Sequence, residues 1–173
     1  WLWHPGILAK HIAATIAAEK ENGQPLHLIV DTDVHEGLQV ELPVIDGQRL
    51  SVEIVDLADY DRTIPTCCQP PVNSSTVLAR LREIDARLAD RMTVDLAPLV
   101  EAWTDLPRCH TLAEQITVAL DRLTRPHIGD QPKLFASELI HFKEIRSAVT
   151  ALRDDPLAAA QSYNEATSRV PNS

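Results

Sequence analysis

The stretch LHLIVDTDVHEG, residues 26–37, decides the fold class of this chain, because an apolar run ends there in a cluster of ionisable side chains. Residues 26–31 are too few for a helix and contain Ile29 and Val30, as is typical of a buried strand. In open α/β sheets, the carboxyl ends of the strands line the ligand crevice. The stretch therefore predicts a buried strand that delivers polar groups to a pocket.

The segments around this strand predict a helix before it and a hairpin after it. Residues 7–20 carry apolar side chains at i, i+4 spacing, which predicts a helix. Residues 38–57 alternate about the Asp46-Gly47 dipeptide, which predicts two antiparallel strands joined by a turn. A helix followed by several strands suits a sheet with a helix packed on one face.

The chain becomes mainly helical beyond a proline-rich loop. Apolar stripes predict helices that begin near residues 77, 96 and 142. Thr111 and Glu114 have capping-box spacing, so they predict a helix start, and Pro126 predicts its end. Residues 132–140 fit either a strand or the start of a helix, and Asp155-Pro156 predicts a further helix start.

We therefore expect an α/β fold with a Rossmann-like sheet in its first part and a helix-rich second part. The expected organisation is a Rossmann-like start over residues 1–62, a loop over residues 63–75, and a helical continuation of the same domain over residues 76–173. The chain begins with Trp1, and its only methionine is Met92. We therefore expect it to be a fragment of a longer protein.

Composition excludes several classes of partner. The chain has 173 residues, of which 45% are hydrophobic and 24% charged, and a net charge of −9. This balance argues against nucleic acid as a partner, and no apolar run approaches the ~20 residues of a membrane span. The odd number of cysteines (Cys67, Cys68 and Cys109) does not suit a disulfide framework, so we expect a cytoplasmic protein.

The first residues offer one candidate binding site. His4, Pro5 and Gly6 lead into a predicted helix that carries Lys10. The free amides and dipole of a helix start favour an anion, and Gly6 would let a ligand approach the backbone. The functional interpretation is a cradle for phosphate or carboxylate beside His4 and Lys10. The alternative is that Pro5 and Gly6 only start the helix and that His4 is a surface residue.

The polar end of the predicted strand offers a second candidate site. Asp31, Asp33 and His35 could bind a divalent metal, or Asp33 or His35 could act as a general base. LIVDTDV also matches the nucleophile motif of haloacid-dehalogenase-type phosphatases, but no later strand ends in the paired aspartates that this family requires. The structural alternative is a polar strand end, with Asp31 capping the turn.

Two segments together resemble the bacillithiol synthase-type proteins, a family of cysteine-adding ligases, and a third segment resembles a helix of related proteins. HPGILAK resembles the family's step into a lysine-bearing helix, DTDVHE its acidic strand end, and SYNEATSR a helix found later in related proteins. The resemblance covers about the first 40 residues and implies a Rossmann-like fold with a nucleotide site. Gly6 and Lys10 match the turn and the helix, and Asp33 and His35 match the strand end approximately. A Gly-His-Gln turn is then expected before Trp1.

The function expected from these observations is a small-molecule ligase or transferase. An ATP-like or ADP-like nucleotide, or another anion, would bind at the helix start, with a hydrogen bond from His4 and charge neutralisation by Lys10. Asp33 or His35 would orient or deprotonate the attacking group. The expected partner is a small-molecule substrate, and no metal is expected. Two alternatives stay open: a metal-dependent hydrolase that uses Asp31, Asp33 and His35, and a non-enzymatic scaffold.

Overall fold

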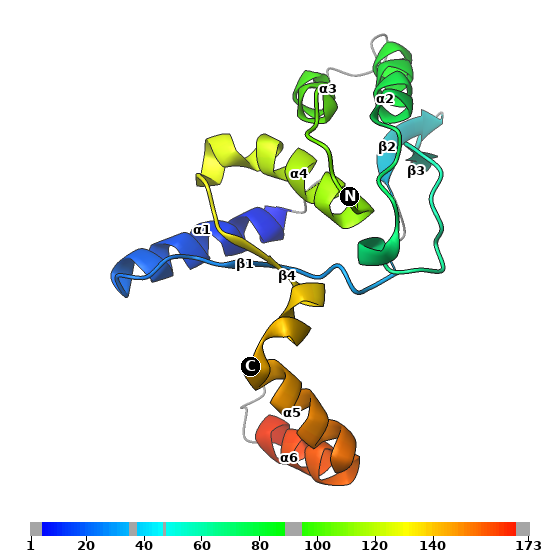
Figure 1. Ribbon diagram of the computed structural model, residues 1–173. Helices are drawn as coiled ribbons and strands as arrows, with labels where there is room; N and C mark the ends of the chain where they lie inside the picture. The colour runs from blue at the N-terminus through cyan, green and yellow to red at the C-terminus, as the bar shows by residue number, and fades with distance from the viewer. Residues whose placement is uncertain (1–4, 35–37, 47, 89–94, 169–173) are drawn as a thin grey trace.

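A computed structural model describes residues 5–34, 38–46, 48–88 and 95–168 of the chain (Figure 1). In chain order, its elements are α1 (Pro5–Lys20), β1 (His27–Ile29), β2 (Gln39–Asp46), β3 (Arg49–Asp56), the 3-10 helix η1 (Thr66–Cys68), α2 (Ser74–Leu88), α3 (Ala97–Trp103), α4 (Leu112–Ile128), β4 (Lys133–Phe135), the 3-10 helix η2 (Ala136–His141), α5 (Lys143–Asp154) and α6 (Pro156–Ser168). Every helix and strand that the sequence predicts is present.

The strands form two separate pairs in the part of the chain that the structure describes. β1 and β4 run parallel, in the register His27↔Lys133 to Ile29↔Phe135. β2 and β3 run antiparallel about residue 47, as the alternation predicts. The chain is therefore mixed α/β, and a Rossmann-like sheet is not confirmed.

The main hydrophobic core lies between the β2–β3 hairpin and helices α2, α3 and α4 (Figure 1). Helix α2 buries the apolar stripe that its sequence predicts. The largest fully buried side chains of the described residues come from α2 and α4, and they are Val77, Leu81, Ile84 and Leu112. Full burial of one such side chain contributes about 1.5–3 kcal/mol to the free energy of unfolding. This region is the best-packed part of the molecule.

Helix α4 starts as its sequence predicts but ends later. The Thr111 hydroxyl accepts a hydrogen bond from the Glu114 amide at 3.1 Å. Pro126 does not end the helix, because α4 continues to Ile128. A proline in the last turn removes only one backbone donor. The last turn is completed by the Gly129 amide, which donates a hydrogen bond to the Arg125 carbonyl oxygen. Gly129 has a φ angle of 72°.

Residues 132–140, which fit either a strand or a helix start by sequence, contain a strand followed by helical turns. Residues 133–135 form β4 because they pair with β1, and η2 follows at once. The prediction that β1 is a buried strand is wrong, since Leu28 is 45% exposed and Val30, just after the strand, is 60% exposed. β1 is instead a half-buried strand at one side of a two-stranded pair.

Helices α5 and α6 form a hairpin, which we call the C-terminal arm, and it stands apart from α2, α3 and α4 (Figure 1). The Asp155 carboxylate accepts a hydrogen bond from the Ala158 amide at 3.0 Å, as its predicted position at a helix start requires. No described residue of α5 is buried. In the described ranges, no helix has the length and apolar character needed to cross a membrane.

Candidate functional site

A cavity of about 290 Å³ opens between α4 and the parallel pair β1–β4. Its wall is mostly apolar, and this wall consists of Leu28, Ile29, Val30, Ile116, Leu120 and Ile128. Small-molecule sites in proteins are typically concave, largely apolar and furnished with a few convergent polar groups. We call this cavity the histidine pocket, after the two histidines that line it.

Helix α4 supplies one side of the histidine pocket because its apolar surface is wider than a single stripe. Leu112 and Ala119 are buried in the core. Ile116, Leu120 and Thr124 follow one another at i, i+4 spacing and line the pocket, as residues on one face of a helix do. The same helix therefore closes the core and forms the pocket wall.

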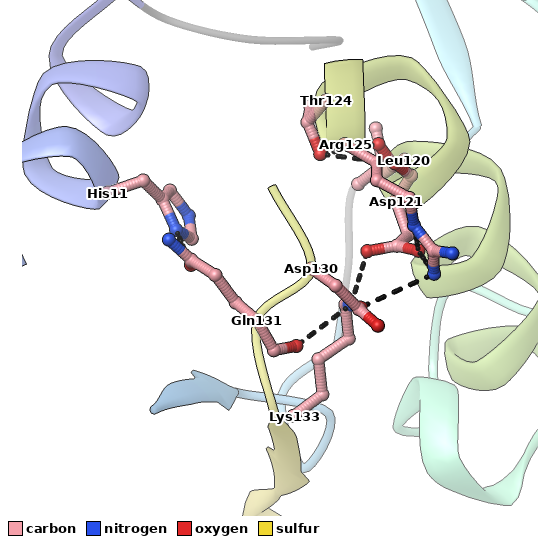
Figure 2. Close-up of polar contacts among 8 residues, drawn as sticks. All are labelled: His11, Leu120, Asp121, Thr124, Arg125, Asp130, Gln131 and Lys133. Carbon is pink, nitrogen blue, oxygen red and sulfur yellow. Dashed lines mark hydrogen bonds and ion pairs between the residues drawn. The ribbon is translucent and has the colours of Figure 1, made fainter. Parts of the chain in front are cut away.

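His11 reaches the pocket from α1 and is held by a buried glutamine. His11 Nδ1 lies 2.8 Å from Gln131 Oε1, and Gln131 Nε2 donates to the Thr15 hydroxyl at 2.9 Å. Because the glutamine carbonyl only accepts, His11 carries its proton on Nδ1. His11 and Gln131 are both buried, and Figure 2 shows them facing each other.

His27, the first residue of β1, stacks its ring edge-on against the His11 ring. The two ring centroids lie 4.2 Å apart, with an interplanar angle of 81°. Burial lowers the pKa of His27, and the nearby charges of His11 and Lys133 lower the same pKa further, against a smaller opposing effect of Asp121. His27 is therefore a neutral imidazole at pH 7, with one nitrogen that accepts a hydrogen bond.

An ion-pair cluster lies at the pocket wall, where the second half of α4 faces the start of β4 (Figure 2). Lys133 Nζ pairs with Asp121 Oδ1, and Arg125 Nη2 lies 2.5 Å from Asp121 Oδ2. Burial of Asp121 opposes its ionisation, but the hydrogen bonds from Lys133 and Arg125 outweigh that effect and hold the pKa of Asp121 below its usual value. Arg125 Nη2 also lies 3.4 Å from Asp130 Oδ1, so the cluster contains two cations and two carboxylates.

Asp31 is the most deeply buried charged side chain at the pocket, with 2% exposure. Its carboxylate accepts hydrogen bonds from the Ser137 amide at 2.9 Å and the Ser137 hydroxyl at 2.5 Å. Its carbonyl oxygen accepts from the Thr66 hydroxyl at 3.1 Å and the Cys67 amide at 3.0 Å. Asp31 thus joins β1 to η1 and η2 and does not cap a turn of its own segment.

Lys10 borders a second, smaller cavity, which we call the lysine pocket. This cavity of about 250 Å³ is lined by Lys10, Pro25 and Leu26, among others. His11, His27 and Gln131 line both pockets. The histidine pair is therefore a wall that the two pockets share.

The other predicted site residues are placed as follows. His4 and His35 lie outside the described residues. Gly6 is the second residue of α1. Asp33 is exposed beyond the end of β1 and lines neither the histidine pocket nor the lysine pocket. The structure thus places Lys10 beside the start of β1 and Asp33 past its end, so the two candidate sites are not brought together in either pocket.

The described residues offer little for a metal or a reactive thiol. No three of their His, Cys, Asp or Glu side chains are grouped so as to hold a metal ion. The Asp31 carboxylate, which the hydrolase alternative needs, accepts two hydrogen bonds from Ser137. Burial raises the pKa of Cys67, as does its hydrogen bond with Cys68, and burial also raises the pKa of Cys109.

Sequence reasoning missed His11, His27 and Gln131 as site residues. One local signal was present: His27, Ile29 and Asp31 alternate at i, i+2, i+4, which places them on one side of a strand. No local pattern points to Gln131, because its partner His11 lies 120 residues away in sequence.

No family model, curated protein or solved structure matches this chain. The resemblance to bacillithiol synthase-type proteins therefore stays a prediction. What the chain does has to be argued from the two pockets and the side chains that line them.

Proposed function

We propose that this chain acts as a small-molecule ligase or transferase, in which two substrates meet at the histidine wall. The observation that carries the proposal is the sharing of His11, His27 and Gln131 by two adjacent cavities. The smaller of the two cavities is bordered by the exposed cation Lys10. An enzyme that joins two molecules must hold them side by side, and such positioning supplies much of the rate acceleration.

His27 is the proposed general base. A neutral imidazole near pH 7 can take a proton from an attacking amine, hydroxyl or thiol. Its ring lies at the boundary of both cavities, where the attacking group of one substrate would face the electrophile of the other. In this proposal His27 takes over the role that the sequence predicts for Asp33 or His35.

Lys10 is the proposed contact for the anionic substrate. Its ammonium is exposed on α1 at the lysine pocket, which supports the prediction of a nucleotide or other phosphate-bearing molecule near the start of that helix. A lysine serves such a ligand as a point charge. The expected Rossmann-like fold belongs to the same proposal.

The proposal is tested by titrating ATP into the full chain in a calorimeter. Lys10→Ala should weaken ATP binding about tenfold, which corresponds to the loss of one charge-assisted hydrogen bond. Lys20→Ala is the matched control, because Lys20 is an exposed lysine in the last turn of the same helix. Equal affinity of wild type and Lys10→Ala removes the role of Lys10, and a wild type that does not bind ATP favours the scaffold alternative.

A further inference from the structure

We infer that the histidine pocket binds an uncharged, largely apolar group that donates one hydrogen bond to His27. This inference rests on the proposed function and names the class of the second substrate at the same site. It follows from the charge of the lining, from the hydrogen bonds that the lining already makes, and from the shape of the apolar wall.

The lining disfavours an anion. Its carboxylates, Asp31 and Asp121, outnumber its ammonium, Lys133, by one. The Lys133 ammonium is occupied by Asp121 and by the Gln131 carbonyl oxygen at 3.2 Å. An anionic group would therefore meet a net negative wall and, among the described lining residues, no cation without a carboxylate partner.

The lining also offers few hydrogen bonds beyond the one at His27. The Thr66 hydroxyl donates to the Asp31 carbonyl oxygen at 3.1 Å, and the Thr124 hydroxyl donates to the Leu120 carbonyl oxygen at 2.9 Å. The amide of Gln131 is engaged at both its oxygen and its nitrogen. A ligand with many polar groups would lose its hydration here without replacement, which is unfavourable.

The His27 ring and the Thr117 hydroxyl are the exceptions among the described polar side chains that line the pocket. The His27 backbone amide donates to the Pro132 carbonyl oxygen at 2.9 Å. Its ring contacts His11 edge-on, and within the described ranges the ring nitrogens have no hydrogen-bond partner. The accepting nitrogen of this half-buried neutral imidazole can be satisfied by one hydrogen-bond donor of a ligand.

The apolar wall sets the size of the ligand. A cavity of about 290 Å³ has room for one fused ring system or a branched aliphatic chain. Each Å² of apolar surface that such a ligand removes from water contributes about 25 cal/mol to binding. The occupant is thus an apolar body with a single hydroxyl or N–H directed at His27.

Three probes that share the indole ring system test this inference in the full chain. Indole is neutral and has one N–H donor, 1-methylindole lacks that donor, and indole-3-carboxylate adds a negative charge. In an NMR titration indole should bind about fivefold more tightly than 1-methylindole, the loss expected for one hydrogen bond, and indole-3-carboxylate should bind more weakly than indole. Equal affinity of indole and 1-methylindole, or tighter binding of the carboxylate, overturns the inference.

Two variants locate the probe in the pocket. Leu28→Trp fills a lining position and should abolish indole binding. Val34→Trp is the matched control, because Val34 is a similarly exposed residue of the same segment that does not line the pocket. Both wild-type side chains are about half exposed, so both variants should fold. Indole binding that is equal in the two variants would contradict the assigned site.

His27 itself is tested by the preference for indole over 1-methylindole. The preference should disappear in His27→Leu and return in His27→Gln, whose amide oxygen can accept the same hydrogen bond. A preference that survives in His27→Leu overturns the role of His27.

The outcomes for the two proposals are distinguishable. Indole binding without ATP binding removes the ligase or transferase proposal and keeps the ligand class of the pocket. ATP binding that depends on Lys10, together with failure of the indole arms, keeps the proposed function and overturns this inference.

Discussion

The core around α2 and the C-terminal arm carry the same kind of sequence pattern but differ in packing. Val77, Leu81 and Ile84 on α2 are fully buried, whereas Ile145 and Val149 on α5 are exposed. Apolar side chains recur at helical spacing in both, and both segments are helices, as predicted. The difference teaches that periodicity identifies the helix, whereas burial requires a partner surface.

The pocket region lies between these two extremes. Strands β1 and β4 have only three residues each and half-buried side chains, and α4 contributes its flank. Buried polar contacts, such as those of His11 and Asp31, link this region over long sequence separations. The site is therefore held together by specific hydrogen bonds more than by a large apolar core.

The largest expected effect is a difference in stability between variants of the core and variants of the C-terminal arm. Leu81→Ala should lower the free energy of unfolding by about 2–5 kcal/mol, because the site is fully buried and a cavity remains. Leu152→Ala makes the same change at a residue of α5 that is 56% exposed, and it should have a much smaller effect. Denaturant unfolding measures both, and equal losses would contradict the comparison.

A smaller effect is expected at the link between β1 and η2, the 3-10 helix that leads into the arm. Ser137→Ala removes one of the hydrogen bonds to the buried Asp31 carboxylate, which should lower the free energy of unfolding by about 1–3 kcal/mol. Ser51→Ala is the control, because the Ser51 hydroxyl makes an exposed bond of 3.3 Å. If both variants unfold at the same denaturant concentration as wild type, the Asp31–Ser137 contact does not stabilise the fold.

The smallest change in the free energy of unfolding is expected when a helix cap is removed, and the caps of α4 and α6 can be compared. Thr111→Ala removes the hydroxyl that caps α4 and should lower the free energy of global unfolding by about 0.5–2 kcal/mol. Asp155→Ala removes the cap of α6 and should leave global unfolding unchanged while amide exchange in the arm speeds up. Global destabilisation by Asp155→Ala as large as that by Thr111→Ala would show that the arm unfolds together with the core.

The sequence predicts the local elements well because their signals are local. The capping pair Thr111–Glu114, the hairpin about Asp46 and the start of α6 each depend on residues a few positions apart. It does not predict the pairing of β1 with β4 or the helical turn after Pro126. Three-residue strands carry almost no pattern, and a proline in a last turn costs the helix only one bond.

The candidate site was predictable only in part. The sequence predicts Lys10 as a contact for an anion and Asp31 as a possible metal ligand, and both residues line a pocket. His11, His27 and Gln131 were missed because their contacts join segments far apart in the chain, which no spacing rule reports. Asp33 was predicted as a site residue because ionisable residues surround it in sequence, whereas its side chain is exposed beyond the end of β1.

The proposed reaction requires a neutral His27 that contacts ligands in both pockets. An NMR pH titration of the His27 ring protons tests its protonation state directly. The signal is assigned by its loss in His27→Gln. The expected pKa lies below 6.5, because burial and then the charges of His11 and Lys133 disfavour the imidazolium over the smaller opposing effect of Asp121. The unfolded chain then binds this proton more strongly, so stability falls as the pH drops from about 6.5 through the folded-state pKa.

At pH 7.5 the same His27 signal should shift when indole is added, and shift again when ATP is added to the indole-saturated protein. A pKa at or above 6.5, or a ring signal that neither probe moves, would contradict a histidine wall shared by two occupied pockets.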